Sequence, residues 1–231
     1  EMVDTGNPCT GISNWSASSG INGGTPGKRN AAAGINADIV TPKLLRAYAT
    51  DSITVVLVFN EPLDSIQASV AASYTISDGI GSPLSASALP GLFNRVVLRY
   101  VGNGVLQRNR IHTISVGAVT DCSGNSIGQD NSARVALYEP TDKKSIVINE
   151  ILFNPWPNGN DYVEIYNRSE QVLNLRNAYV AGRNSSGVLS GIRQLSVEDY
   201  LLFPGDFIVI TEKASLVLNN YVAMKPDAFL E

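Results

Sequence analysis

This chain has little of what most catalytic and ligand-binding sites are built from. It has 231 residues but a single histidine and only two cysteines. That excludes a metal site rich in histidine and leaves one imidazole for proton transfer. Charged residues make up 16% of the chain, are scattered along it, and give a formal net charge of −4. Because there is no basic run, the sequence lacks the electrostatic footprint of a protein that binds nucleic acid or an anionic membrane.

Long apolar runs are missing as well. No stretch approaches the ~20 apolar residues that cross a bilayer, and the sequence does not begin with a basic region followed by an apolar one. We therefore expect either a cytoplasmic chain or one whose export signal has been removed.

Spacing also argues against a phosphate-binding loop. The stretch GINGGTPGKRN, residues 20–30, places glycines before Lys28, as a P-loop does. The first glycine of that motif would fall at Asn22, and Arg29 stands where the motif needs a serine or threonine. The sequence therefore does not predict nucleotide binding.

The residues that are plentiful indicate a turn-rich β protein. The chain has 20 glycines, 11 prolines and 44% hydrophobic residues, enough for one or two cores. Residues 53–59, ITVVLVF, are apolar on both faces, which predicts a central strand covered on both sides. Between Lys43 and Pro140 the other expected strands are LLRAYA, SYTIS, NRVVLRYV, IHTISVGAV and ARVALYE.

A second strand-rich region follows the segment YEPTDKKS, where we expect a domain boundary. Two strands at 146–153 and 161–167 flank a loop with two prolines, and a third short strand is expected around residues 175–180. A Gly- and Ser-rich loop then precedes YLLFPGDFIVIT, which predicts a turn at Pro204-Gly205. The best helix candidate is 212–220. Residues 1 to about 40 have little periodicity and, taken alone, are typical of a linker.

Several of these stretches resemble known families. VINEILFNP, DYVEIYNRSEQVLNLRNAYVAG and LLFPGDFIVIT, in that order, resemble the opening half of a bacterial lamin-tail domain, an Ig-like β-sandwich of secreted multidomain proteins. VVLVFNEPLD, SYTIS and ISVGAVTDCSGNSI resemble a bacterial Ig-like domain of the S-layer type. NPCTGISNWSASSGINGGTPGKRN is similar to the closing segment of a lamin-tail domain.

The resemblance implies an all-β chain with two Ig-like β-sandwiches in tandem. Residues 1–40 would be the closing segment of one lamin-tail-like domain, residues 41–140 the bacterial Ig-like domain, and residues 145–231 the front of a second lamin-tail-like domain. That second domain is incomplete, and its open sheet would expose apolar faces. We expect residues 1–40 to lie against such a half-domain, in the same chain or in a neighbouring copy by strand exchange.

Catalysis is not the interpretation that the sequence favours. His112 alternates with Ile114 and Val116, which predicts a place in the core. Glu150 and Glu164 fall on adjacent expected strands and could form an acid/base pair. No nucleophile motif accompanies them, so with Asn149 they are expected to bind turn N–H groups and order the Pro-rich loop.

The turn TDCSGNSIGQD has two interpretations. Asp121, Asn125 and Asp130 offer oxygen ligands for a cation such as calcium, although their spacing is not that of an EF-hand. The favoured alternative is an Asx turn in which Asp121 accepts hydrogen bonds from the N–H groups of Ser123 and Gly124.

Aromatic residues are the candidates for ligand binding. Trp156, between two prolines, together with Tyr162 and Tyr166, could stack against a carbohydrate or another polymer. The alternative for Trp156, which we prefer, is a wedge that packs its loop onto the sheet.

The resemblance implies a non-catalytic structural, adhesion or spacer segment of a larger exported bacterial protein, in an extracytoplasmic location and without a cofactor. The alternatives are a carbohydrate- or polymer-binding module and an accessory domain of a secreted nuclease or hydrolase. The expected partners are other domains of the same protein, a surface glycan or protein, and a neighbouring copy; nucleic acid is not among them.

The two cysteines give a first testable prediction. In an exported Ig-like sandwich, Cys122 lies in the turn before the last strand, at the pole where Cys9 enters, so the two are expected to form a disulfide. A thiol titration of denatured, non-reduced protein made in an oxidising compartment should find no reactive thiol. Two thiols per chain would refute the pairing.

Overall fold

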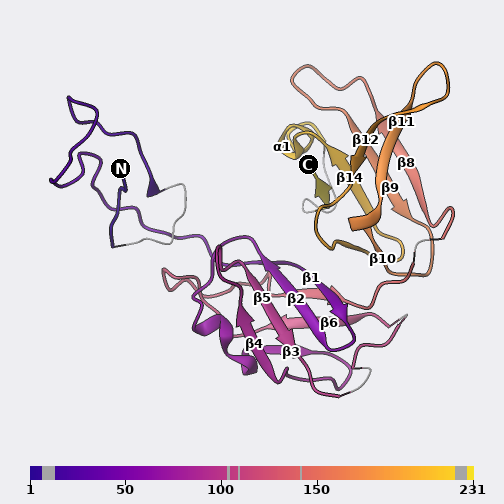
Figure 1. Cartoon of the computed structure of the whole chain (residues 1–231), viewed down its shortest axis with the longest axis horizontal. Helices are drawn as coiled ribbons and strands as arrows, with labels where there is room; N and C mark the ends of the chain where they lie inside the picture. Colours follow the sequence, from indigo (N-terminus) through magenta and orange to yellow (C-terminus); the bar gives the residue numbers. More distant parts are fainter. Residues whose placement is uncertain (7–13, 103–104, 109, 141, 222–227) are drawn as a thin grey trace. The chain divides into compact units, whose positions relative to one another are not determined.

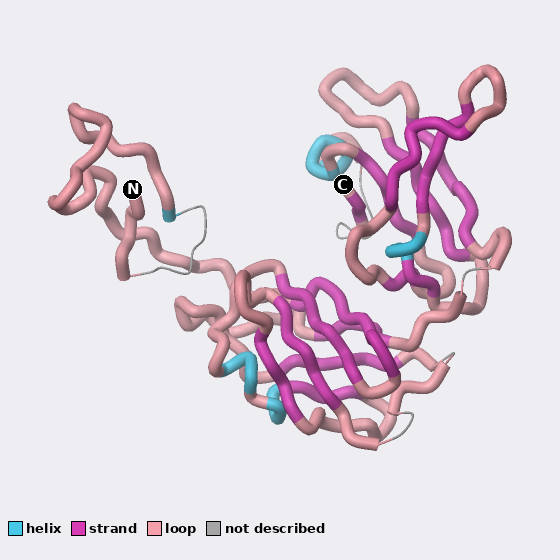
Figure 2. Tube along the Cα trace, in the orientation of Figure 1, coloured by secondary structure: helices cyan, strands magenta, loops and turns pink. Residues whose placement is uncertain are grey.

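The structure is a computed structural model that describes residues 1–6, 14–102, 105–108, 110–140, 142–221 and 228–231 (Figure 1). Figure 2 shows that regular structure in these residues is almost all strand, which confirms the expected all-β sandwich class. The helix expected at 212–220 is present as α1 (Ala214–Leu218). In the described residues there is no helix with the length and apolar character to span a bilayer.

The chain folds as two compact units that interleave in sequence. The first comprises Glu1–Arg46, Thr54–Val101 and Thr113–Ala133, and the second comprises Ala47–Ile53, Gly102–His112 and Arg134–Glu231.

The part of the fold between residues 44 and 135 consists of two antiparallel sheets. One is four-stranded in the order β1-β2-β5-β4, and the other is three-stranded in the order β3-β6-β7. The strands are β1 (Leu44–Asp51), β2 (Thr54–Phe59), β3 (Tyr74–Ile76), β4 (Ser85–Ala88), β5 (Arg95–Arg99), β6 (His112–Val116) and β7 (Ser132–Val135).

The apolar strand β2 organises this part of the fold. All six of its residues are buried, and it pairs on one side with β1 and on the other with β5, as its two-sided apolar pattern predicts. Strand β4 was not anticipated, because its sequence SASA has only small side chains. It forms because β5 presents an unpaired edge to it, from Ser85 opposite Arg99 to Ala88 opposite Val96.

The N-terminal segment is ordered around its first four residues, which the linker-like composition did not predict. The Glu1 carboxylate accepts hydrogen bonds from Ser18 Oγ at 2.9 Å, Thr25 Oγ1 at 2.5 Å and the Ala32 N–H at 3.0 Å. Hydrogen bonds to this side chain lower the pKa of Glu1, because they favour its charged form. Met2 pairs with Trp15 in an antiparallel bridge.

The second unit is built around a four-stranded sheet in the order β15-β14-β9-β8, with two short strand pairs, β10-β13 and β11-β12. The strands are β8 (Ile146–Leu152), β9 (Tyr162–Asn167), β10 (Leu173–Asn174), β11 (Tyr179–Arg183), β12 (Leu189–Gln194), β13 (Leu201–Leu202), β14 (Phe207–Thr211) and β15 (Phe229–Leu230). Strand β15 runs parallel to β14, and the other pairs of this sheet are antiparallel.

Most of the sequence predictions for this unit are confirmed. The Pro204-Gly205 turn is closed by an Asp206 N–H to Phe203 carbonyl bond of 3.0 Å, and Gly205 has a φ of 76°, which glycine adopts without strain. The strand expected at 175–180 begins later than predicted, because β11 begins only at Tyr179. Residues Leu175–Asn177 form a 3₁₀ turn, and the Gly- and Ser-rich segment after it forms the hairpin β11-β12.

A small core holds the second unit together. Its buried members come from both the large sheet and the covering segments: Ile165, Leu175, Leu195, Leu202 and Ile208. At the end of β9, Asn167 is fully buried, and its amide donates to the carbonyls of Gln171 at 2.8 Å and Leu202 at 2.9 Å. Its oxygen accepts from the N–H and the hydroxyl of Ser169. One side chain therefore connects the sheet to β13.

We expect Asn167→Ala to destabilise the second unit by about 2–3 kcal/mol, because two buried carbonyls would lose their donors. Chemical denaturation measures this. Asn184→Ala is the matched control: exposed Asn184 also binds two backbone N–H groups, those of Ser186 and Val188. The control should cost under about 1 kcal/mol, and equal losses in the two variants would contradict a special role for Asn167.

Candidate functional site

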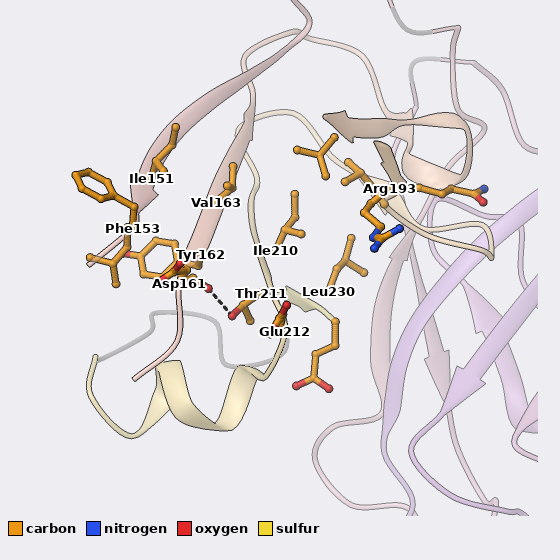
Figure 3. A pocket seen from close by; sticks show the side chains of 15 residues that line it. Ile151, Phe153, Asp161, Tyr162, Val163, Arg193, Ile210, Thr211, Glu212 and Leu230 are labelled. Carbon is orange, nitrogen blue, oxygen red and sulfur yellow. Dashed lines mark hydrogen bonds between the residues drawn. The ribbon is translucent and has the colours of Figure 1, made fainter. Parts of the chain in front are cut away.

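A cavity of about 480 Å³ opens in the second unit (Figure 3). We call it the sandwich cavity. Its walls are mostly apolar and come from the large sheet, from the hairpin β11-β12 and from the C-terminal residues. The labelled apolar wall residues are Ile151, Phe153, Val163, Ile210 and Leu230.

The cavity exists because the sheet is only partly covered. Val163 and Ile210 are paired across β9 and β14 on the same face as the core residues Ile165 and Ile208, and they continue that apolar face into the cavity. Beside them, the middle of β8 is exposed, and so is all of β12. This end of the sandwich therefore has an apolar floor without a complete second layer.

The polar rim of the cavity is predominantly acidic. Asp161, Glu212 and Glu231 line it, together with Arg193. Thr211 Oγ1 donates to the Asp161 carbonyl at 2.7 Å and so ties the start of β9 to the end of β14. The Glu231 carboxylate accepts from the Ala214 N–H at 2.6 Å, at the start of α1.

Two carboxylates face each other on the outer side of the sheet. Glu150 and Glu164 are cross-strand partners in β8 and β9, as the sequence predicts. Tyr162 Oη donates to Glu150 at 2.6 Å, and Asn149 Nδ2 donates to Glu164 at 2.7 Å. The expectation that these carboxylates bind turn N–H groups is wrong, because their donors are neighbouring side chains. Each carboxylate is thereby supplied with a donor, which offsets the repulsion between like charges.

The hydroxyl of Tyr162 stays protonated over an unusually wide pH range. Burial raises the pKa of Tyr162, and the hydrogen bond to Glu150 and the negative charges of Glu150 and Glu164 raise it further. A phenol held in this way is a hydrogen-bond donor and a poor nucleophile.

The aromatic candidates of β9 share this outer face. Tyr166 stacks on Phe207 with ring centroids 4.5 Å apart and an interplanar angle of 24°. Tyr162 meets Tyr221 edge to face at 6.2 Å. Tyr162 and Tyr166 flank Glu164 on one strand, so aromatic and carboxylate groups alternate along a half-buried stripe.

Trp156 does not pack its loop onto the sheet, and the wedge interpretation is wrong. Its side chain is 69% exposed. The loop is held by its backbone: the Gly159 N–H bonds the Trp156 carbonyl at 2.8 Å. A Cβ at Gly159 would lie 2.9 Å from that carbonyl oxygen and from the Pro155 Cβ, so the turn excludes larger residues there. The indole is therefore presented to solvent.

The candidate cation ligands of the first unit are only partly brought together. Asp121 is buried, and its Oδ1 accepts from the N–H groups of Ser123 and Asn125, both at 2.8 Å. The Asx turn is thus present, although the Gly124 N–H bonds the Asp121 carbonyl at 3.3 Å instead of the side chain. Asn125 Nδ2 donates to Asp121 Oδ2 at 2.8 Å. Asp130 is elsewhere, in an ion pair with Lys43 at 2.9 Å.

Two further carboxylates lie beside Asp121, and no local sequence pattern indicates them. Oxygens of Asp38, Glu61 and Asp121 lie within 4.8 Å of one another, a spacing at which carboxylates could hold a hard cation. The pKa of Glu61 is raised, chiefly by burial and then by the charges of Asp38 and Asp121. Asp38 precedes Glu61 by 23 positions and Asp121 follows Glu61 by 60, so only the folded chain brings the three together.

Two further candidates from the sequence, His112 and Cys9, remain to be placed. His112 is 3% exposed on β6, whose Ile114 and Val116 are also buried, so it belongs to the core as predicted. Cys9 lies outside the described residues, and its disulfide with Cys122 stays a prediction.

No protein family model and no curated protein matches the chain. Three solved structures resemble it: the S-layer protein rSbsC(31-844), at 17% identity and a TM-score of 0.38; the N-terminal part of the bacterial S-layer protein SbsC, at 15% and 0.39; and domains 1–6 of surface layer protein SbsC, at 18% and 0.39.

The matches cover 66%, 72% and 66% of this chain, and 19%, 45% and 19% of those structures. The chain thus spans less than half the length of each. At these identities and TM-scores the likeness establishes neither a family nor a function. The lamin-tail and Ig-like assignments remain predictions that rest on the sequence motifs.

The Asp38, Glu61 and Asp121 cluster predicts a pH-dependent stability. A folded-state pKa above the usual 4.5 of Glu61 means that its ionised form destabilises the fold, so stability falls as pH rises through that pKa. Glu61→Gln should therefore raise the free energy of unfolding at pH 7, and with it the melting temperature. The gain should be less than about 1 kcal/mol because the group is partly exposed. The gain should disappear below pH 4, where the wild-type carboxyl is protonated.

Melting curves between pH 3.5 and 8 measure this difference. Glu170→Gln, at an exposed position in the second unit, serves as the control and should change little at any pH. A Glu61→Gln variant less stable than the wild type at pH 7 would show that the carboxylate is needed, for instance as a cation ligand.

Proposed function

We propose that this chain is a non-catalytic structural segment of a larger exported bacterial protein, acting as a spacer or adhesion surface. The observation that supports this most is how its polar side chains are used. Asp121 closes a turn, Asn167 connects two parts of a sandwich, and Glu1 organises the N-terminal segment. Each of these side chains forms its hydrogen bonds with the chain's own backbone or side chains.

The paired carboxylates fit the same role. Glu150 and Glu164 are engaged by Tyr162 and Asn149, and Glu150 lies on an exposed part of β8. A glycosidase pair needs one carboxyl group with a raised pKa facing another across a substrate cleft. The only histidine is buried in the core. A non-enzymatic role accounts for these features with the fewest assumptions.

An extracytoplasmic location follows from the motifs. The lamin-tail and S-layer-type resemblances both point to exported bacterial proteins, in which a Cys9–Cys122 disulfide could form and persist. In such proteins a chain of sandwiches acts through its length and its surfaces, and its partners are other domains and copies of the same protein.

The stripe on β9 favours a second candidate, a polymer-binding module. Tyr162, Glu164 and Tyr166 alternate ring, carboxylate and ring, an arrangement that stacks on sugar faces and accepts hydrogen bonds from their hydroxyls. The exposed Trp156 adds a further platform. The chain could equally carry such a surface as the accessory domain of a secreted nuclease or hydrolase.

A glycan array and pull-downs with insoluble polysaccharides separate the two candidates. For a spacer we expect no specific binding above background. Specific binding that is lost at least tenfold in Trp156→Ala or Tyr166→Ala would reject the spacer and establish the polymer-binding module.

Tyr179→Ala is the matched control for this experiment. Tyr179 is an exposed aromatic on β11, outside the β9 stripe. Equal losses of binding in Tyr179→Ala and Tyr166→Ala would indicate nonspecific adsorption through exposed aromatic rings. The spacer assignment would then stand.

A further inference from the structure

The sandwich cavity and the exposed edge of β8 form one continuous acceptor surface. Strand β8 is the last strand of its sheet, so among the described residues its outer edge has no strand partner. Ile148, Ile151 and Phe153 are exposed along it, and Ile151 and Phe153 also line the cavity. A seven-residue apolar strand with an unpaired edge is a template for another strand.

Natural edge strands are usually protected, and β8 has little protection. Its sequence, IVINEIL, contains no lysine and no proline, and its one charged residue, Glu150, is engaged by Tyr162. A bulge between Ile148 and Glu150 is its only irregularity. This combination favours a surface that is covered in the assembled protein.

The N-terminal segment offers a strand with the matching properties. The residues on either side of Trp15 are hydrogen-bonded to Glu1–Val3. The Val3 N–H donates to the Asn14 carbonyl, and the Ser16 N–H donates to the Glu1 carbonyl. Backbone groups alternate along an extended strand, so those of Trp15 and Ala17 point to the opposite edge. In the part of the chain that the structure describes, that edge has no strand partner.

Side chains on the segment also lack a core of their own. Trp15 is 60% exposed, and Ile21, in the turn closed by the Gly23 N–H to Gly20 carbonyl bond of 2.8 Å, is fully exposed. Residues 15–19 would extend over about 17 Å and β8 over about 23 Å, at 3.3 Å per residue, so this stretch can pair along most of β8.

Charge is complementary as well. The cavity rim carries Asp161, Glu212 and Glu231 against Arg193. Residues 14–37 contain no acidic side chain, and they include the exposed pair Lys28 and Arg29. Lys28 and Arg29 lie outside the stretch around Trp15, so their attraction to the acidic rim favours the encounter of the two copies and not the contact itself.

We propose that residues 15–19 of one copy of this chain add as a strand to the β8 edge of a second copy, with Trp15 entering the sandwich cavity beside Ile151 and Phe153. The inference rests on the proposed structural role and names its partner: the chain itself. Because donor and acceptor are different surfaces, the contact is heterologous and links copies head to tail.

Complementation between two full-length variants tests this arrangement. Trp15→Asp removes the donor, and Ile151→Asp introduces a charge on the acceptor; both positions are exposed, so the fold should survive, as circular dichroism will show. In analytical ultracentrifugation the wild type should associate with rising concentration. Each variant alone should associate at least tenfold more weakly. An equimolar mixture of the two should form a dimer with one copy of each, since one intact donor and one intact acceptor remain.

The controls are Ile35→Asp in the donor segment and Val197→Asp in the second unit, two exposed positions outside the proposed contact. Both should associate like the wild type. A wild type that stays monomeric at all concentrations would overturn the inference, and so would a Trp15→Asp variant that still dimerises through β8 alone. Either result would leave the spacer role standing, because that role is judged by polymer binding and not by self-association.

Discussion

The second unit depends on one constraint: an apolar sheet face must be covered by another layer. Ile165 and Ile208 meet this requirement through Leu175, Leu195 and Leu202, and the result is a small core. Two residues along the same strands, Val163 and Ile210 are not fully covered by a second layer, and the result is a cavity. The same two strands thus contribute to both the core of the unit and its cavity.

The first unit satisfies the same constraint with material close at hand. All six residues of strand β2 are buried, and β1 and β5 pair with its two edges. Its polar groups are arranged at the edges of this core. Asp121 closes a turn close to Asp38 and Glu61, and burial, followed by the charges of Asp38 and Asp121, raises the pKa of Glu61.

Function in such a protein is carried by surfaces more than by a site. The aromatic and carboxylate stripe of β9, the exposed indole of Trp156 and the edge of β8 lie on or beside one sheet. A spacer, a polymer-binding module and a self-associating segment would all use faces of this sheet, and they differ in which face is occupied. The exposed apolar residues of β8 favour a protein strand as the occupant of that edge.

The sequence by itself determined the strands that have a strong apolar pattern. Alternating and two-sided apolar patterns are local, and they located β2, β6, β8, β9 and β14 as well as the core position of His112. Tertiary structure decided what local patterns cannot encode. Strand β4 exists because β5 offers it an edge. Asp130 forms an ion pair with Lys43 and does not join Asp121 in one ligand set. Trp156 faces solvent because a backbone turn holds its loop. Each of these depends on residues distant in sequence or on one exact backbone turn, so only the folded chain brings them about.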